Sequence, residues 1–245
     1  MIAIVAALPQ ELAAIEEAAA AEGAVVSRTI AGHRIHTGRL AGREIVFALS
    51  GLGKVAAASA ATVLVEQARA VLVVGTAGGL GSDVRPGDVV VAAELLQHDM
   101  DPRPLFGRWE LPSLGLSRIP ADRALTAALA AAAEVVVGSH RPDLAALGLP
   151  DPHWHLGLVA SGDVFVATTD VAERLRRELP DALAVEMEGA AVAQVCHQAG
   201  VPFAVARTIS DQADHESAID FPRFLGAVAA PYARDLVMTA LPWCG

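Results

Sequence analysis

The chain has 245 residues, 53% of them hydrophobic, and a formal net charge of −10 at pH 7. This length favours a single domain with a large buried core, while 18 Lys and Arg residues scattered along an acidic chain argue against a nucleic-acid-binding surface. The acidic balance also favours a neutral or cationic small molecule over a polyanion as the ligand.

The N-terminal segment has a short apolar run followed by an alanine-rich stretch. A secretory signal would begin with positive charge and continue as an unbroken apolar segment, but Glu11 and Glu16 interrupt this one. We therefore predict a strand at 2–6 and a helix at 9–21. No apolar stretch reaches the length of about 18 residues that a membrane helix needs, so we predict a soluble protein without a membrane partner.

The next part of the chain contains short β-type runs separated by glycine-containing turns, with no room for helices between them. This spacing predicts antiparallel strands at 25–30, 33–37 and 44–49. Apolar runs then alternate with alanine-rich helical stretches, as in parallel sheets covered by helices. The further predicted strands are 71–75, 88–92, 156–160, 183–187 and 203–209, and the further predicted helices are 55–67, 121–136, 170–178, 188–199 and 217–239.

These elements predict an α/β protein, one domain spanning 1–245 with a mixed central sheet flanked by helices. Two segments rich in Pro, Gly, Arg and Trp, 101–120 and 138–154, are predicted to be loops that cover a site. The two cysteines, Cys196 and Cys244, are too few for a disulfide framework, so we predict a cytoplasmic protein in a reducing compartment. No Cys or His spacing indicates a metal site.

Two glycine turns follow predicted strands. The segment VVGTAGGL, at 73–80, either lets a ligand approach the backbone or makes only a tight turn. The segment SGLGKVAAASA, at 50–60, fits the loose dinucleotide pattern G-x-G-x-x-A. That pattern requires an acidic residue about twenty positions later, whereas the next strand ends in Gly75 and Thr76. We therefore expect no nicotinamide cofactor.

Four acidic residues stand where predicted strands end or helices begin. Glu11 lies in the first turn of the first predicted helix, where an acidic side chain complements the helix dipole. Glu186 and Glu188 lie at a strand–helix junction, and Asp211 follows Ser210 in a pair that is more often a turn or a cap than an acid. Glu11, Glu188 and Asp211 nevertheless converge on the edge where an open α/β sheet places its ligand crevice, which predicts chemistry there.

Eight motifs between Ile2 and about Phe224 resemble the nucleoside phosphorylase and nucleosidase superfamily, and within it the 5'-methylthioadenosine/S-adenosylhomocysteine nucleosidases. The resemblance implies a three-layer α/β/α fold, a nucleoside substrate, no cofactor, and a homodimer in which residues 101–113 close the partner's pocket. The motifs, in the family's order, are AALPQELAAI, HTGRLAGREIVFALSGLGKVAAA, GTAGGL, GDVVVA, QHDMD, ASGDVFV, AVEMEGAAVAQVC and VPFAVARTISDQAD.

The same resemblance implies residue roles. Asp211 would protonate or hydrogen-bond N7 of adenine, and Glu11 would activate the attacking water. Glu188 would hold ribose hydroxyls, with Glu186 in a supporting role near the water and the sugar. The other implied substrate-site residues are Arg207 and Ser210, which would position the acids, Thr76 by the water and ribose, Met187 under the sugar, Phe165 and Phe221 around the base, Val166 at the base edge, Leu8 and Leu52 near the 5' group, and Gly78.

This constellation suits cleavage of an N-glycosidic bond. The reaction places positive charge on the sugar and negative charge on the departing purine, so it needs an acid at the base and carboxylates near the ribose. An Asp in the acid role needs a raised pKa, which an apolar pocket provides.

The sequence also bears on whether the nucleophile is water or phosphate. Family phosphorylases gather arginines around a phosphate, one of them just before the glycine turn, where this chain has Val74. We therefore predict a purine nucleosidase that hydrolyses 5'-methylthioadenosine and S-adenosylhomocysteine. The alternatives on the same fold are a purine nucleoside phosphorylase and a 6-amino-6-deoxyfutalosine nucleosidase, and the alternative of another class is a non-catalytic nucleoside sensor.

Overall fold

The computed structural model describes residues 1–213 and 221–244. Within them, ten strands form one mixed sheet in the order β10-β6-β8-β9-β5-β1-β4-β3-β2, with β7 paired to β6. The strands are β1 Ile2–Ala6, β2 Val26–Ile30, β3 His33–Leu40, β4 Arg43–Leu49, β5 Val71–Gly79, β6 Val89–Gln97, β7 Ile119–Pro120, β8 Trp154–Ser161, β9 Ala182–Glu186 and β10 Phe203–Asp211. The helices are α1 Pro9–Glu22, α2 Lys54–Val65, α3 Arg123–Ser139, α4 Arg141–Ala146, α5 Thr169–Glu178, α6 Gly189–Ala199, α7 Phe221–Phe224 and α8 Ala230–Ala240, with a π-helical turn at Leu225–Ala229 and a 3-10 turn at Leu241–Trp243.

The sheet curls because β10 pairs on both of its edges. It runs parallel to β5 and antiparallel to β6, so β5, β9, β8, β6 and β10 close into a ring. The remaining strands extend from β5 through β1, which is parallel to both β4 and β5. The meander β2-β3-β4 is antiparallel, as its glycine turns predicted.

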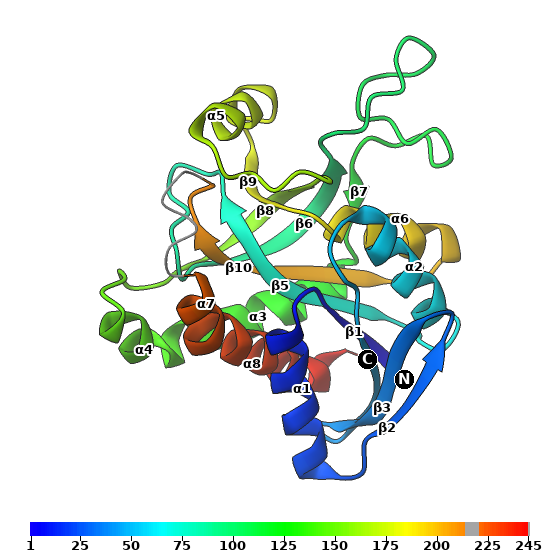
Figure 1. Cartoon of the computed structure of the whole chain (residues 1–245), viewed down its shortest axis with the longest axis vertical. Coiled ribbons are helices and arrows are strands. Elements are labelled where there is room, and N and C mark those ends of the chain that lie inside the picture. Colours follow the sequence, from blue (N-terminus) through cyan, green and yellow to red (C-terminus); the bar gives the residue numbers. More distant parts are fainter. Residues whose placement is uncertain (214–220, 245) are drawn as a thin grey trace.

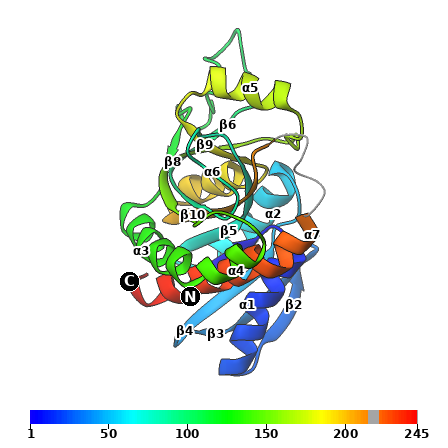
Figure 2. The same ribbon diagram turned by 90° about the vertical axis from the view of Figure 1, so that its left-hand side faces the viewer.

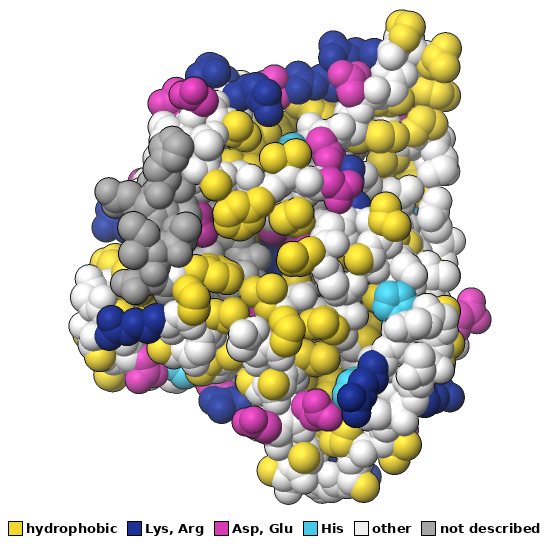
Figure 3. Space-filling model, viewed as in Figure 1, with side chains coloured by type: hydrophobic (Ala, Val, Ile, Leu, Met, Phe, Trp, Pro, Cys, Tyr) yellow, Lys and Arg dark blue, Asp and Glu magenta, His cyan; other side chains and the backbone are white. Residues whose placement is uncertain are grey.

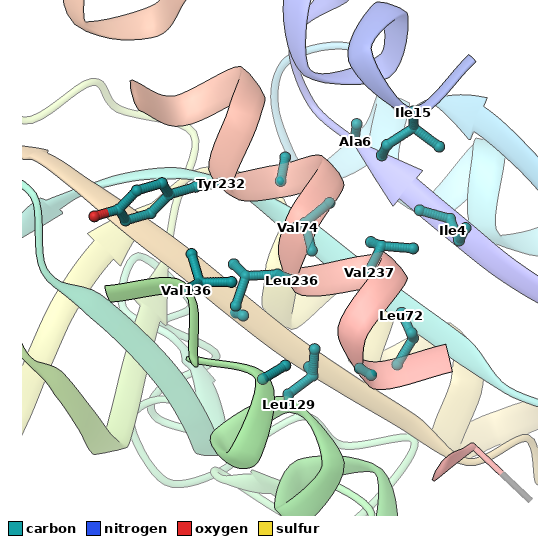
Figure 4. Close-up of a cluster of buried hydrophobic side chains, with 14 of the residues drawn as sticks. Ile4, Ala6, Ile15, Leu72, Val74, Leu129, Val136, Tyr232, Leu236 and Val237 are labelled. Carbon is teal, nitrogen blue, oxygen red and sulfur yellow. The ribbon is translucent and has the colours of Figure 1, made fainter. Parts of the chain in front are cut away.

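Helices cover the sheet on two sides, which confirms the three-layer α/β/α arrangement. Figures 1 and 2 show α1, α3 and α8 on one side and the packed pair α2 and α6 on the other. On the first side, Leu236 and Val237 of α8 meet Leu72 and Val74 of β5 in a buried cluster (Figure 4). Since β1 and the first part of β5 are buried on both faces, they have continuous apolar runs in place of alternation.

The structure confirms the nine predicted strands and most helices, with ends that differ by a few residues. The prediction of loops alone at 138–154 and 101–120 was wrong. The first contains α4, whose six residues give too short a pattern to detect and which is held by buried Leu144 packed over Gly87. The second contains β7, only two residues long and paired with Glu94 and Leu95 of β6.

The predicted C-terminal helix contains a π-helical turn. Its first four residues, 217–220, lie outside the described residues, and the rest is α7, the π-helical turn and α8, which follow one another without a gap. Pro231, in the first turn of α8, has no amide hydrogen to donate, so the regular hydrogen-bond pattern is lost next to the π-helical turn. No helix among residues 1–213 and 221–244 is long and apolar enough to cross a membrane.

Candidate active site

A cavity of about 320 Å³ opens on the face shown in Figure 3, where hydrophobic side chains gather around a hollow. This volume lies within the range of small-molecule sites, and the mainly apolar wall with a few polar groups is typical of them. The lining residues are Ala7, Leu8, Leu52, Thr76, Ala77, Gly78, Val164, Phe165, Val166, Val185, Glu186, Met187, Glu188, Ser210, Asp211 and Phe221.

The cavity lies where two sets of strands with opposite directions meet. Strands β1, β4, β5 and β10 run one way, whereas β9 is antiparallel to β5 and parallel to β8. The carboxyl end of β1 therefore lies beside the middle of β5, with Ala6 opposite Val74, and the carboxyl end of β9 lies beside the last residues of β5, with Val185 opposite Gly78. We expected the acids to lie along a single edge of the sheet, where the carboxyl ends of its strands meet. The predicted acids do converge, but at this junction.

Glu11 lies behind the cavity wall and is fully buried. Its Oε2 accepts a hydrogen bond from the Leu8 amide at 3.0 Å, and its Oε1 has no hydrogen-bond partner among the described residues. Burial raises the pKa of Glu11 to about 7, against the lowering effects of the Leu8 amide and the Arg207 charge. Glu11 can therefore exchange a proton near neutral pH.

Arg207 is the fully buried cation beside Glu11. Its Nη2 donates to Glu186 Oε2 and lies 3.8 Å from Glu188 Oε2. Burial disfavours its charge, but Glu186, Glu188 and Glu11 together raise its pKa. Nε and Nη1 have no hydrogen-bond partner among the described residues.

Gly75 makes the position of Arg207 possible. A Cβ at Gly75 would collide with Arg207 Nη1 and would lie 3.4 Å from Glu11 Oε2. The prediction of a turn after residue 75 was wrong, because β5 continues to Gly79. The first glycine of this segment makes room for a buried guanidinium. This role was not among those predicted from the sequence.

Glu186 is the most completely bonded carboxylate of the site. Its Oε2 accepts from the amides of Glu188 at 3.0 Å and Gly189 at 2.7 Å, as well as from Arg207. Its Oε1 accepts from the hydroxyl of fully buried Ser161, which itself accepts from the Ala190 amide. Glu186 thus caps the first turn of α6 and anchors Arg207.

Among the described residues, Glu188 and Asp211 are the two other acidic residues that line the cavity besides Glu186. Glu188 Oε1 accepts from the Gly53 amide at 2.9 Å. Burial and the neighbouring Glu186 charge raise the pKa of Glu188, and Arg207 opposes them. Asp211 Oδ2 accepts from Ser210 Oγ at 2.6 Å, and its Oδ1 accepts from the Ala213 amide at 2.7 Å.

The structure brings the predicted site residues together. All of them line the cavity except Glu11 and Arg207, which are fully buried and hydrogen-bond to the lining residues Leu8 and Glu186. Sequence reasoning missed Ser161 and the Gly53 amide. Both lie inside motifs that carried the resemblance, ASGDVFV and SGLGK, but a motif alone does not say which carboxylate its polar group binds.

Among residues 1–213 and 221–244, no group of three or more His, Cys, Asp or Glu side chains could hold a metal ion. The QHDMD and HWH segments are not drawn together: the buried His98 packs over Gly162, and His155 Nε2 bonds to Asp88 at 2.9 Å. The polar groups described at the cavity are carboxylates, the hydroxyls of Thr76 and Ser210, one guanidinium and backbone amides.

Comparison with known proteins places this geometry in a family. The family model described as the phosphorylase superfamily matches residues 1–242. A 5'-methylthioadenosine/S-adenosylhomocysteine nucleosidase from Neisseria meningitidis, solved with methylthio-immucillin-A, is 33% identical with a TM-score of 0.84, over 98% of this chain and 97% of that one.

Two further solved structures are similar to this chain. The 5'-methylthioadenosine/S-adenosylhomocysteine nucleosidase from Colwellia psychrerythraea, in complex with adenine, is 32% identical with a TM-score of 0.87, covering 99% of this chain and 94% of that one. The futalosine hydrolase of Helicobacter pylori is 31% identical with a TM-score of 0.78, covering 96% of each chain.

Proposed function

The chain belongs to the phosphorylase superfamily, and we propose that it is a nucleosidase that hydrolyses the N-glycosidic bond of 5'-methylthioadenosine and S-adenosylhomocysteine, releasing adenine. One observation carries the proposal. Three buried carboxylates surround one buried guanidinium on one side of the cavity, and a separate acid, Asp211, lines another part of the same cavity. The similar nucleosidases of Neisseria and Colwellia support the same reaction.

The charges suit a sugar that becomes cationic as the bond breaks. Glu188 reaches the cavity and is held by the Gly53 amide, so its carboxylate is ready to bind ribose hydroxyls and to stabilise positive charge. Asp211 is oriented by Ser210 and by the Ala213 amide, and in this proposal it delivers a proton to the purine. Phe165 and Val166 supply an apolar wall for the base.

Glu11 is the proposed general base for water. Its pKa of about 7 matches the requirement that a base near neutral pH be able to take up a proton. Its Oε1 and the Nη1 of Arg207 have no hydrogen-bond partner among the described residues, so each needs a polar partner from elsewhere. In this proposal the attacking water is that partner.

Local charge favours water over phosphate as the nucleophile. Arg207 is the cation among the groups described around the cavity, and Glu11, Glu186 and Glu188 outnumber it. A phosphate ion would therefore meet net negative charge, whereas phosphate sites use several Arg or Lys donors.

A product assay tests the function. The protein is incubated with 5'-methylthioadenosine, S-adenosylhomocysteine, inosine or 6-amino-6-deoxyfutalosine, each with and without phosphate, and the products are separated by chromatography. We expect adenine and free 5-methylthioribose from methylthioadenosine, with no gain in rate from phosphate. A ribose 1-phosphate product would show that the protein is a phosphorylase. Turnover of the futalosine derivative alone would show that this compound, and not methylthioadenosine, is the substrate.

Replacing Glu188 with Ala is expected to raise KM and lower kcat together, because the ribose loses a charged hydrogen-bond acceptor worth about tenfold or more in affinity. Parallel kinetics on ribo and 2'-deoxyribo substrates measure this role. The parent should prefer the ribo substrate strongly, and the variant should lose most of that preference. A variant that discriminates as well as the parent would exclude ribose binding by Glu188.

A homodimer in the cytoplasm is part of the same proposal. Residues 101–118 project from the sheet (Figure 1), and Leu105 and Phe106 near their start are exposed, as are Leu52 and Val55 near the cavity. Apolar groups at these places suit burial by a second copy, whose residues 101–113 would close the cavity. We expect sedimentation velocity to give a dimer, and a monomer that turns over substrate at full rate would contradict this.

The cysteines, neither of which is in a disulfide, suit a reducing compartment.

A further inference from the structure

Lys54, Asp99 and Asp163 form a cluster of side chains beside the cavity, here called the Lys54 cluster. Lys54 Nζ lies 2.6 Å from Asp99 Oδ1 and 3.8 Å from Asp163 Oδ2. The Lys54 amide donates to Asp163 Oδ1 at 2.7 Å, and the Asp163 amide donates to Asp99 Oδ2 at 2.9 Å. Each residue therefore contacts both of the others, although none of the three lines the cavity.

The cluster joins segments that the sheet order keeps apart. Lys54 begins α2 after β4, Asp99 follows β6, and Asp163 follows β8. Strands β6 and β8 are neighbours, but β9, β5 and β1 lie between β8 and β4. In a flat sheet those four steps would span about 19 Å. Because the sheet curls, the turn after β4 meets the turn after β8, and the Lys54 cluster ties the two turns together.

The Lys54 cluster is directly connected to residues that line the cavity. The Gly53 amide binds Glu188 Oε1 inside the cavity, and the next amide along the chain, that of Lys54, binds Asp163. Gly53 has a φ of 87°, and a Cβ there would lie only 3.0 Å from Asp163 Oδ1. Asp163 is followed at once by the cavity wall 164–166. Movement of Asp163 would therefore shift both the wall and the support of Glu188.

The ion pair at the centre of the cluster is partly shielded from solvent. The side chains of Lys54 and Asp99 are 17% and 25% exposed. Burial alone would raise the pKa of Asp99, but the hydrogen bonds from Lys54 Nζ and the Asp163 amide lower it below its usual value. The pair is thus held in one geometry, unlike most exposed ion pairs, which contribute little.

We propose that Lys54, Asp99 and Asp163 are positioning residues that hold the cavity wall 164–166 at the distance from Glu188 that the nucleoside requires. The inference rests on the proposed function in one respect, because it treats this wall as the binding surface for the base. It assigns a role to the conspicuous Lys of the SGLGK turn and to two acids that the proposed chemistry leaves unused.

Adenine binding and steady-state kinetics on methylthioadenosine measure the effect. Asp163→Ala should raise the Kd for adenine and the KM roughly tenfold, because the Lys54 amide and Nζ lose a charged partner, with kcat changed much less. Asp163→Asn keeps an acceptor for the Lys54 amide and should restore binding to within about twofold of the parent. The matched control is Asp181→Asn, an Asp bonded to Arg118 at 2.6 and 3.0 Å outside the cavity, which should match the parent throughout.

Hydrogen exchange tests positioning without any ligand. The Gly53 amide, which donates to Glu188, and the Gly162 amide, which donates to the Glu186 carbonyl just before the wall 164–166, should exchange faster in Asp163→Ala than in the parent, and at the parental rate in Asp163→Asn. A parent that binds no adenine would refute the proposed function, and the exchange result would still decide the cluster. Unchanged exchange in Asp163→Ala, or a lower Tm with parental Kd and KM, would overturn the positioning role.

Discussion

Replacing Asp211 with Asn is expected to lower kcat by two orders of magnitude or more, because general acid catalysis contributes about 10²–10⁴-fold. Asn keeps the size of Asp and an acceptor for the Ala213 amide, but it has no carboxyl proton to deliver. Substrate affinity should stay within about tenfold of the parent, since binding needs only hydrogen bonding. Single-turnover kinetics and calorimetry with a slow substrate analogue separate the two quantities.

Ser210→Ala provides the matched comparison for Asp211→Asn. This variant removes only the hydroxyl that donates to Asp211 Oδ2 at 2.6 Å, so the acid remains but is less well oriented. We expect it to lose roughly tenfold in kcat, the cost of about one hydrogen bond to a charged group. An Asp211→Asn variant that turned over at near the parental rate would remove Asp211 from the mechanism.

Glu11→Gln is the second substitution from which we expect a collapse of kcat, because Gln keeps the hydrogen bond from the Leu8 amide but cannot take a proton from water. The carboxylate is the active form of a base, and its pKa is about 7. The parental kcat/KM should therefore rise as pH increases through 7. The kcat/KM of the variant should not show this rise with pH.

Glu16→Gln is the control for this change, since it lies in the same helix but has an exposed side chain near His36. It should retain the parental rate and pH profile, while Glu11→Gln should still bind adenine. A Glu11→Gln variant with high activity would return Glu11 to the plain role of an acidic residue at a helix N-terminus.

The elements were predictable where a local pattern is long and strong. The buried runs of β1 and β5 and the alanine-rich α1 and α6 met this condition, and the structure has them within a few residues. Short elements such as α4 and β7 have too few residues to show a hydrophobic periodicity. They form because tertiary contacts hold them. The antiparallel approach of β9 to β5 was not predicted either, because strand direction depends on the ring closed by β10.

The resemblance identified the residues that meet at the cavity, but it did not identify the contacts that hold them in place. Residue types in motifs pointed to Asp211, Glu188 and Glu11, and these do converge. Nothing in the sequence indicated that Gly75 makes room for a guanidinium or that Ser161 bonds to Glu186, because both facts depend on contacts between segments far apart in the chain. The predicted roles of the site residues stay predictions until the variants above are measured.

The carboxylates gathered around Arg207 lower the stability of the folded protein. A buried acid with a raised pKa weakens the folded state when it ionises, and polar atoms of Glu11 and Arg207 that have no hydrogen-bond partner among the described residues add to that cost. An engineering campaign that selected this protein for heat resistance alone would therefore favour neutral side chains at Glu11 and Glu188. Because these two residues are the proposed base and the proposed ribose ligand, such a campaign must screen for turnover at every round.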